Sequence, residues 1–159
     1  SRNTGSYFNY CFSLGSVTGS NAASGIVNAG GFCGLMDMNG GPSRINNCAA
    51  LGDSVTARSN DNDKLNVTRI YNAEFENKGN NNYAIDTMRI GKGAYGTLSI
   101  TPEHPSSDIG SSYNGISVSD FTFRDPRFWQ TTLGFDTLKW NFNTVASRGY
   151  PILRGVGGQ

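Results

Sequence analysis

Three cysteines are the residues of this 159-residue chain with the clearest potential for covalent chemistry. Cys48 lies 37 positions after Cys11, in a similar local sequence, and Cys33 lies between them. An odd number of cysteines argues against a pure disulfide framework. The simplest interpretation is that Cys11 and Cys48 are buried free thiols, which pack as small apolar side chains. A disulfide between them would require that they lie on adjacent strands, and no histidine accompanies them to indicate a zinc site.

The segment 91–96 matches the pattern Gly-x-Gly-x-x-Gly that occurs in dinucleotide-binding proteins. Such a site needs a helix after the glycines, so that its N-terminus faces the pyrophosphate. The residues that follow, 97–101, alternate as a strand does. We therefore predict a glycine turn between two strands, and no cofactor is expected.

Asp61 and Asp63 lie two positions apart in the polar segment 58–64. Oxygen ligands at alternate positions can hold Ca²⁺, which makes this pair a weak candidate for a calcium site. The glycine and the glutamate of an EF-hand loop are missing at their expected positions. We predict a solvated surface loop, and a calcium-stiffened spacer is one alternative function.

Catalytic residues of other kinds are sparse. The only histidine, His104, lies in a Pro-Glu-His-Pro turn sequence, and nothing links it to a serine or cysteine nucleophile. Polysaccharide lyases and glycosidases use clustered acids. Glu103 with Asp108, or Asp120 with Asp125, are candidate pairs, but spacing alone does not place two carboxylates across a cleft. A carbohydrate-active enzyme is therefore the alternative to a noncatalytic protein.

The composition favours a stack of short strands. Hydrophobic residues make up 36% and charged residues 16%, and glycine contributes 21 residues. A helical bundle would need sustained apolar stripes, whereas stacked strands need only a thin core. The net charge of +1, without basic runs, gives no support for nucleic-acid binding. No apolar run is long enough for a membrane-spanning helix.

The chain contains an internal repeat. Residues 8–18 align with residues 45–56, with one extra residue before Val55-Thr56, and a fainter copy at 81–85 places Tyr83 opposite Cys48. Periods of 20–50 residues indicate solenoids, in which one unit stacks on the next. The expected core positions are these: Phe8, Cys11, Leu14, Val17, Phe32, Cys33, Ile45, Cys48, Leu51, Val55 and Tyr83.

Turn residues separate the expected strands. Gly30-Gly31 predicts a corner with positive φ, residues 65–71 alternate as a half-buried strand does, and residues 83–90 resume a strand. From 91 to 115 the repeat is lost. Aromatic residues then gather near the C-terminus, where a solenoid needs an atypical cap. The expected cap residues are Phe128, Trp129, Leu133, Phe135, Trp140 and Tyr150, and a carbohydrate-stacking platform is the functional alternative.

The run from Gly30-Gly31-Phe32-Cys33-Gly34 to Ile45-Asn46-Asn47-Cys48-Ala49-Ala50-Leu51-Gly52 resembles the glycine-rich GLUG repeats of bacterial surface proteins. The sequel, with Asn81-Asn82-Tyr83-Ala84, Phe128-Trp129, Leu133-Gly134-Phe135-Asp136 and Tyr150-Pro151-Ile152-Leu153, is similar to the end of such repeat regions in Bacteroidales surface proteins and relatives of the IgA-specific metalloproteases. The chain lacks the His-Glu-x-x-His motif, so the resemblance does not carry peptidase activity over.

The resemblance implies an all-β, right-handed parallel β-helix, secreted or displayed on the bacterial cell surface. We expect repeats over 1–90 and an irregular β region with a cap over 91–159, in one continuous domain. The expected role is noncatalytic: adhesion to a glycan or a host surface protein through an elongated face, or spacing.

The chain starts at Ser1, with neither an initiator methionine nor a signal peptide, inside what looks like a repeat. We therefore expect a piece of a longer protein. The first repeat would then have an uncapped edge, and open strand edges favour self-association.

Overall fold

The computed structural model describes residues 7–23, 25–36, 43–61, 64–73, 79–95, 99–101 and 113–156. The chain forms two compact units, Ser1–Ser117 and Val118–Gln159. The described residues form mostly strands with a few short helices, which confirms the all-β class.

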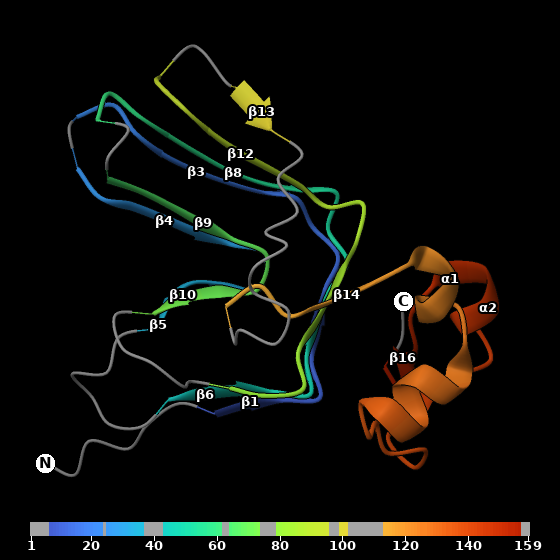
Figure 1. Ribbon diagram of the computed structural model, residues 1–159. Helices are drawn as coiled ribbons and strands as arrows, with labels where there is room; N and C mark the ends of the chain where they lie inside the picture. Colours follow the sequence, from blue (N-terminus) through green and yellow to red (C-terminus); the bar gives the residue numbers. More distant parts are fainter. Residues whose placement is uncertain are drawn as a thin grey trace, which may run out of the picture. The chain divides into compact units, whose positions relative to one another are not determined.

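The first unit contains two sets of five strands that pair one to one (Figure 1). The first repeat, residues 7–36, contains β1 (Tyr7–Asn9), β2 (Phe12–Ser13), β3 (Val17–Asn21), β4 (Val27–Gly30) and β5 (Cys33–Met36). The second repeat, residues 44–73, contains β6 (Arg44–Asn46), β7 (Ala49–Ala50), β8 (Ser54–Ser59), β9 (Leu65–Thr68) and β10 (Tyr71–Ala73). Each strand of the first repeat pairs in parallel with its counterpart in the second.

The register confirms the alignment of the first two repeats. Phe12 lies opposite Ala49, and Val17 lies opposite Val55, so one residue is inserted between the two positions, as the sequence indicates. The alignment of the third copy was wrong by one residue. Tyr83 lies opposite Ala49, which places Asn82 rather than Tyr83 at the position of Cys48. An apolar match favoured tyrosine there, whereas the structure fills the position with a hydrogen-bonding amide.

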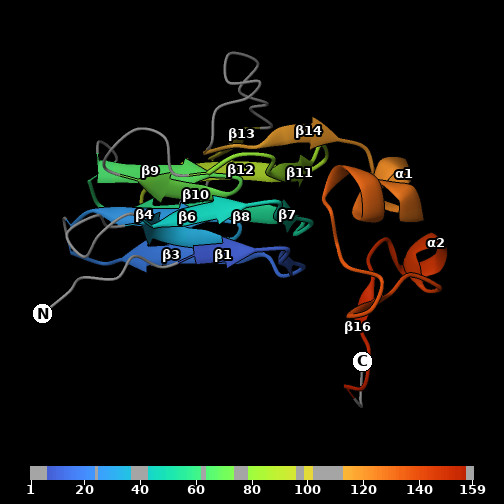
Figure 2. The ribbon, with the colours of Figure 1, turned by 90° about the horizontal axis from the view of Figure 1, so that it is seen from below.

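Four further strands extend these sheets: β11 (Tyr83–Ile85), β12 (Arg89–Gly93), β13 (Ser99–Thr101) and β14 (Ile116–Val118). They give two four-stranded sheets with the orders β14-β11-β7-β2 and β13-β12-β8-β3. Figure 2 shows the strands of successive repeats in layers, from blue through teal to yellow-green. Gly91 and Gly93 belong to β12, and β13 follows as an antiparallel strand. The first two glycines of the Gly-x-Gly-x-x-Gly segment are therefore part of a strand and not of the predicted turn, while Gly96 lies outside the described residues. The next described element is a strand, as predicted, and not the helix that a dinucleotide site needs.

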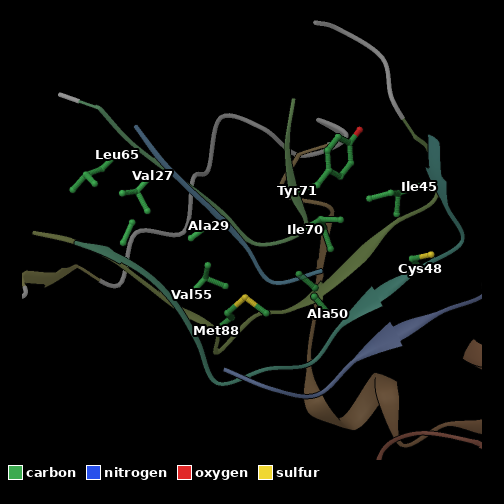
Figure 3. Close-up of a cluster of buried hydrophobic side chains, with 12 residues drawn as sticks. Val27, Ala29, Ile45, Cys48, Ala50, Val55, Leu65, Ile70, Tyr71 and Met88 are labelled. Carbon is green, nitrogen blue, oxygen red and sulfur yellow. The ribbon is translucent and has the colours of Figure 1, made fainter. Parts of the chain in front are cut away.

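Small and medium-sized side chains form the core of the first unit (Figure 3). Of the predicted core residues, Ile45, Cys48, Val55 and Tyr83 are buried, while Cys11, Val17, Phe32, Cys33 and Leu51 are half-buried. The prediction was wrong for Phe8 and Leu14, which are 42% and 45% exposed. Both lie in the first repeat, which has a neighbouring repeat on one side only among the described residues. The residue opposite Phe8 is Ile45, which is fully buried.

The glycine corner at Gly30-Gly31 exists, but for a different reason than predicted. Neither glycine has a positive φ. A Cβ on Gly30 would overlap the carbonyl oxygen of Cys33, and a Cβ on Gly31 would overlap that of Arg69. Close approach of the backbone therefore requires glycine at both positions.

The predicted surface loop 58–64 begins later than expected. Arg58 and Ser59 belong to β8, and Ser59 is fully buried. The Ser59 hydroxyl donates to the carbonyl oxygen of Ala23 at 3.3 Å. A polar residue in this strand is buried because its hydroxyl has partners in the first repeat.

The second unit has its own aromatic core. It contains α1 (Asp120–Phe123), a π-helical turn η2 (Phe128–Thr132), β15 (Trp140–Asn141), α2 (Val145–Arg148) and β16 (Ile152–Leu153). The predicted cap residues Phe128, Trp129, Leu133 and Phe135 are buried here, while Trp140 and Tyr150 are half-buried. The Trp129 indole donates to the carbonyl oxygen of Phe123 at 2.7 Å. The rings of Phe128, Trp129, Phe135 and Trp140 contact one another in sequence. The role of these residues as a cap stays a prediction.

Candidate functional site

The most regular polar feature of the first unit is a turn that recurs in three repeats. We call it the asparagine corner; it consists of residues 9–11, 46–48 and 80–82. The middle residue of each copy, Tyr10, Asn47 and Asn81, has a positive φ between 53° and 57°. Asparagine tolerates this left-handed conformation better than most residues, which explains why two of the three copies use it.

The outer amides of the corner form a ladder across the repeats. Asn46 Nδ2 donates to Asn9 Oδ1 at 3.2 Å, and the backbone N–H of Asn80 donates to Asn46 Oδ1 at 3.0 Å. Beside them, Asn81 Nδ2 donates to Asn47 Oδ1 at 2.6 Å. Equivalent amides therefore lie next to each other on neighbouring strands, about 4.8 Å apart.

Aromatic side chains lie beside this ladder at its first repeat. Tyr7, in β1, is 57% exposed, and Tyr10 in the corner is 44% exposed. Each asparagine amide offers two donors and one acceptor oxygen with two lone pairs. A surface with rows of amides and exposed tyrosine rings can bond hydroxyl groups and stack on flat apolar faces.

The inner residue of the corner is buried and holds two repeats together. Asn82 is 4% exposed. Its Nδ2 donates to the carbonyl oxygen of Ile45 at 2.7 Å, and its Oδ1 accepts from the backbone N–H of Cys48 at 3.1 Å. The equivalent residues in the first two repeats are Cys11 and Cys48.

The three thiols ionise less readily than an exposed cysteine does. Burial raises the pKa of Cys48 to about 12, and burial also raises the pKa values of Cys11 and Cys33. The reactive form of cysteine is the thiolate. At neutral pH all three side chains are therefore protonated, which fits the interpretation that they pack as small apolar groups.

The other candidate residues have local partners where the structure describes them. Asp61 forms an ion pair with Lys64 at 2.9 Å, and Asp63 lies outside the described residues. Asp120 pairs with Arg124 at 2.6 Å within α1, and Asp125 accepts from the backbone N–H of Arg127. Glu103, His104 and Asp108 also lie outside the described residues. No group of three or more metal-ligating side chains gathers in the part of the chain that is described.

Arg69 is a buried charge that the sequence analysis missed. It is 3% exposed, and its guanidinium donates to Ser117 Oγ at 2.7 Å and to the carbonyl oxygen of Gly115 at 3.1 Å. Burial lowers its pKa, while the charge of Asp86 acts in the opposite direction. Arg69 thus ties β14 and the residue before it to the second repeat. Arg69 lies within the alternating segment 65–71, on the same face as Leu65 and Val67, but its charge favours exposure, so the residue type hid its burial.

Comparison with protein-family models, with curated proteins and with solved structures found no match to this chain. Among the helices that the structure describes, none has the length and apolar character needed to cross a membrane.

Proposed function

We propose that the first unit is a right-handed parallel β-helix in a GLUG-like, noncatalytic module of an exported bacterial surface protein. The observation that carries this proposal is the pairing of all five strands of the first repeat, in order and in parallel, with those of the second. Such pairing is what a helical path of the chain with one turn per repeat produces. The resemblance of residues 30–52 to GLUG repeats supports the bacterial cell surface as the location.

We further propose that the asparagine corner binds a glycan. Sugars present hydroxyl groups, which donate and accept hydrogen bonds as amides do, and apolar ring faces, which suit tyrosine. The corner supplies amides at a regular spacing from three repeats, with Tyr7 and Tyr10 beside them. A surface that repeats along the stack would contact several sugar residues of one glycan. The combined binding of these sugars compensates for the weakness of each single contact.

The test is a glycan and mucin array with the folded chain, with heat-denatured protein as the control. Tyr10→Asn installs the residue that the other two repeats have at this position, so we expect the fold to be retained. We expect this variant and Tyr7→Ser to lose binding at least about tenfold, which corresponds to about 1.4 kcal/mol. Tyr95→Ser is the matched control, because Tyr95 is also exposed but lies after β12. No binding by the folded chain would refute adhesion and leave the spacer role.

The first repeat offers a surface for self-association. Strands β1 to β5 each stand at the end of their sheet among the described residues, and Ile26 before β4 is 65% exposed. Open strand edges beside apolar side chains pair with other chains. We propose that the chain forms dimers through this edge. Ile26→Lys introduces the residue of the equivalent position, Lys64, and should weaken the dimer in sedimentation experiments; a strictly monomeric wild type would contradict the proposal.

A further inference from the structure

The register of the first two repeats brings two of the three cysteines together. Phe12 lies opposite Ala49 in the parallel pair β2–β7, so the residues one step earlier, Cys11 and Cys48, also lie opposite each other. The backbone N–H of Ala49 donates to the carbonyl oxygen of Cys11 at 3.0 Å, which holds the two strands together at this point.

The two thiols occupy the same orientation in their repeats. Cys11 Sγ donates to the carbonyl oxygen of Asn9 at 3.3 Å, and Cys48 Sγ donates to that of Asn46 at 3.2 Å. Each thiol thus bonds the residue two positions before it. Cys48 Sγ also lies 3.7 Å from the carbonyl oxygen of Phe8, in the first repeat. The two sulfur atoms are therefore stacked across neighbouring strands.

Neighbouring strands in a sheet lie about 4.8 Å apart, and disulfides join residues whose Cα atoms are about 4.4 to 6.8 Å apart. The pair thus meets the distance condition for a disulfide without a rearrangement of the backbone. Cys33 does not, because its partner in the register is Tyr71. The chain therefore contains one matched pair and one cysteine that serves as an internal control.

We propose that Cys11 and Cys48 are a redox pair that closes to a disulfide between the first and second repeats when the chain meets a small-molecule disulfide. Cys11 is half-buried, whereas Cys48 is fully buried. Cys11 is therefore the thiol that reacts first with the external disulfide, and Cys48 then forms the bond to Cys11.

The two steps balance without any other oxidant. The Cys11 thiol loses its proton and attacks one sulfur of oxidised glutathione; the sulfur–sulfur bond breaks and one glutathione thiol leaves. The Cys48 thiol then loses its proton, attacks the Cys11 sulfur of the mixed disulfide and releases the second glutathione thiol. Two protein thiols are oxidised and one external disulfide is reduced. Oxidising conditions of this kind prevail outside the cytoplasm, where the proposed function places the chain.

The consequence is a covalent link between the first repeat and the second. The first repeat has one neighbour among the described residues, so it is the repeat most prone to separate from the stack. A disulfide at this position stabilises the link without a change to the exposed residues of the asparagine corner. The inference is therefore independent of whether the corner binds a glycan.

The test is to equilibrate the folded, reduced chain with oxidised glutathione, then to count the remaining thiols by alkylation in denaturant and mass spectrometry. We expect the count to fall from three to one, and peptide mapping to show Cys11 linked to Cys48. The variant Cys33→Ser should fall from two thiols to none. Cys48→Ser should give a mixed disulfide at Cys11 and no internal link.

Oxidation in denaturant is the control that shows whether the fold selects the pair, since the unfolded chain should give a mixture of the three possible cysteine pairings. Three free thiols after equilibration of the folded chain would overturn the proposal. A link from Cys33 to either of the other cysteines would overturn it as well. A higher melting temperature of the oxidised chain, absent in Cys48→Ser, would support the proposal, and an equal or lower one would contradict the stabilising role of the link.

Discussion

The buried amide of Asn82 provides the sharpest test of how the repeats are held together. This side chain satisfies two backbone groups of the second repeat, the carbonyl oxygen of Ile45 and the N–H of Cys48. The substitution Asn82→Ala removes both partners at once. No solvent reaches this position, because Asn82 is 4% exposed and both Ile45 and Cys48 are fully buried.

The expected magnitude follows from the two groups that lose a partner. A buried backbone donor or acceptor without a partner costs about 1 to 3 kcal/mol. Asn82→Ala should therefore lower the free energy of unfolding by about 2 to 6 kcal/mol, because two such groups lose their partner. Asn66→Ala is the matched control, since Asn66 is exposed and its side-chain amide donates to the side chain of Asn28. That variant should lose less than about 1 kcal/mol.

Urea denaturation followed by far-ultraviolet circular dichroism measures the strands of the first unit. The slopes for small proteins are about 1 to 3 kcal/mol per molar urea, so the midpoint for Asn82→Ala should move down by about 1 M or more. Fluorescence of Trp129 and Trp140 monitors the second unit separately. A loss for Asn82→Ala no greater than for Asn66→Ala would refute the reasoning, because the two backbone groups would then have other partners.

Three further predictions concern the backbone, the second unit and pH. Gly31→Ala should lower the free energy of unfolding by about 1 to 3 kcal/mol, because the new Cβ would overlap the carbonyl oxygen of Arg69. Gly15→Ala is the control and should cause no such loss, since no atom lies within 4 Å of a Cβ built on Gly15. Equal losses for the two variants in a melting experiment would contradict this reasoning. Trp129→Phe should lower the melting temperature of the second unit, because it leaves the buried carbonyl oxygen of Phe123 without its donor at a cost of about 1 to 3 kcal/mol; Phe121→Ser, at a side chain 84% exposed, is the control. Burial raises the pKa of Cys48 from 9.0 to about 12, so the folded state holds this proton more tightly than the unfolded state. The contribution of this proton to stability is full below pH 9 and is lost as the pH rises from 9 to about 12. Urea unfolding at both ends of this range should show a smaller decline in the free energy of unfolding for Cys48→Ala than for the wild type. Equal declines would contradict this prediction.

Much of the repeat could be predicted, because repetition leaves a direct trace in the residues. The alignment of Cys11 with Cys48, and the extra residue before Val55, correspond to the observed register. The alignment of Tyr83 failed because it relied on apolar character. At that position the third repeat exchanges a thiol for an amide, and only the hydrogen-bond partners of Asn82 reveal the equivalence.

The asparagine corner was visible in part. The sequence shows that asparagine recurs beside the repeated cysteines, and this favours turns. It does not show that the amides of different repeats bond one another, since that depends on which residues become neighbours across strands. The exposure of Phe8 was missed for the same reason: its type predicts burial, but its repeat has a neighbouring repeat on one side only among the described residues.

By itself, the sequence determined the all-β class, the period of the repeat, the turn residues and the concentration of aromatic residues near the C-terminus. Those features depend on local preferences and on the residue types at a regular spacing. Only the tertiary structure decided which cysteines are neighbours, which asparagines are buried, and that Arg69 lies inside the first unit. The physical reason is that burial and pairing depend on two segments in contact. The residues of one segment do not specify which other segment will lie against it.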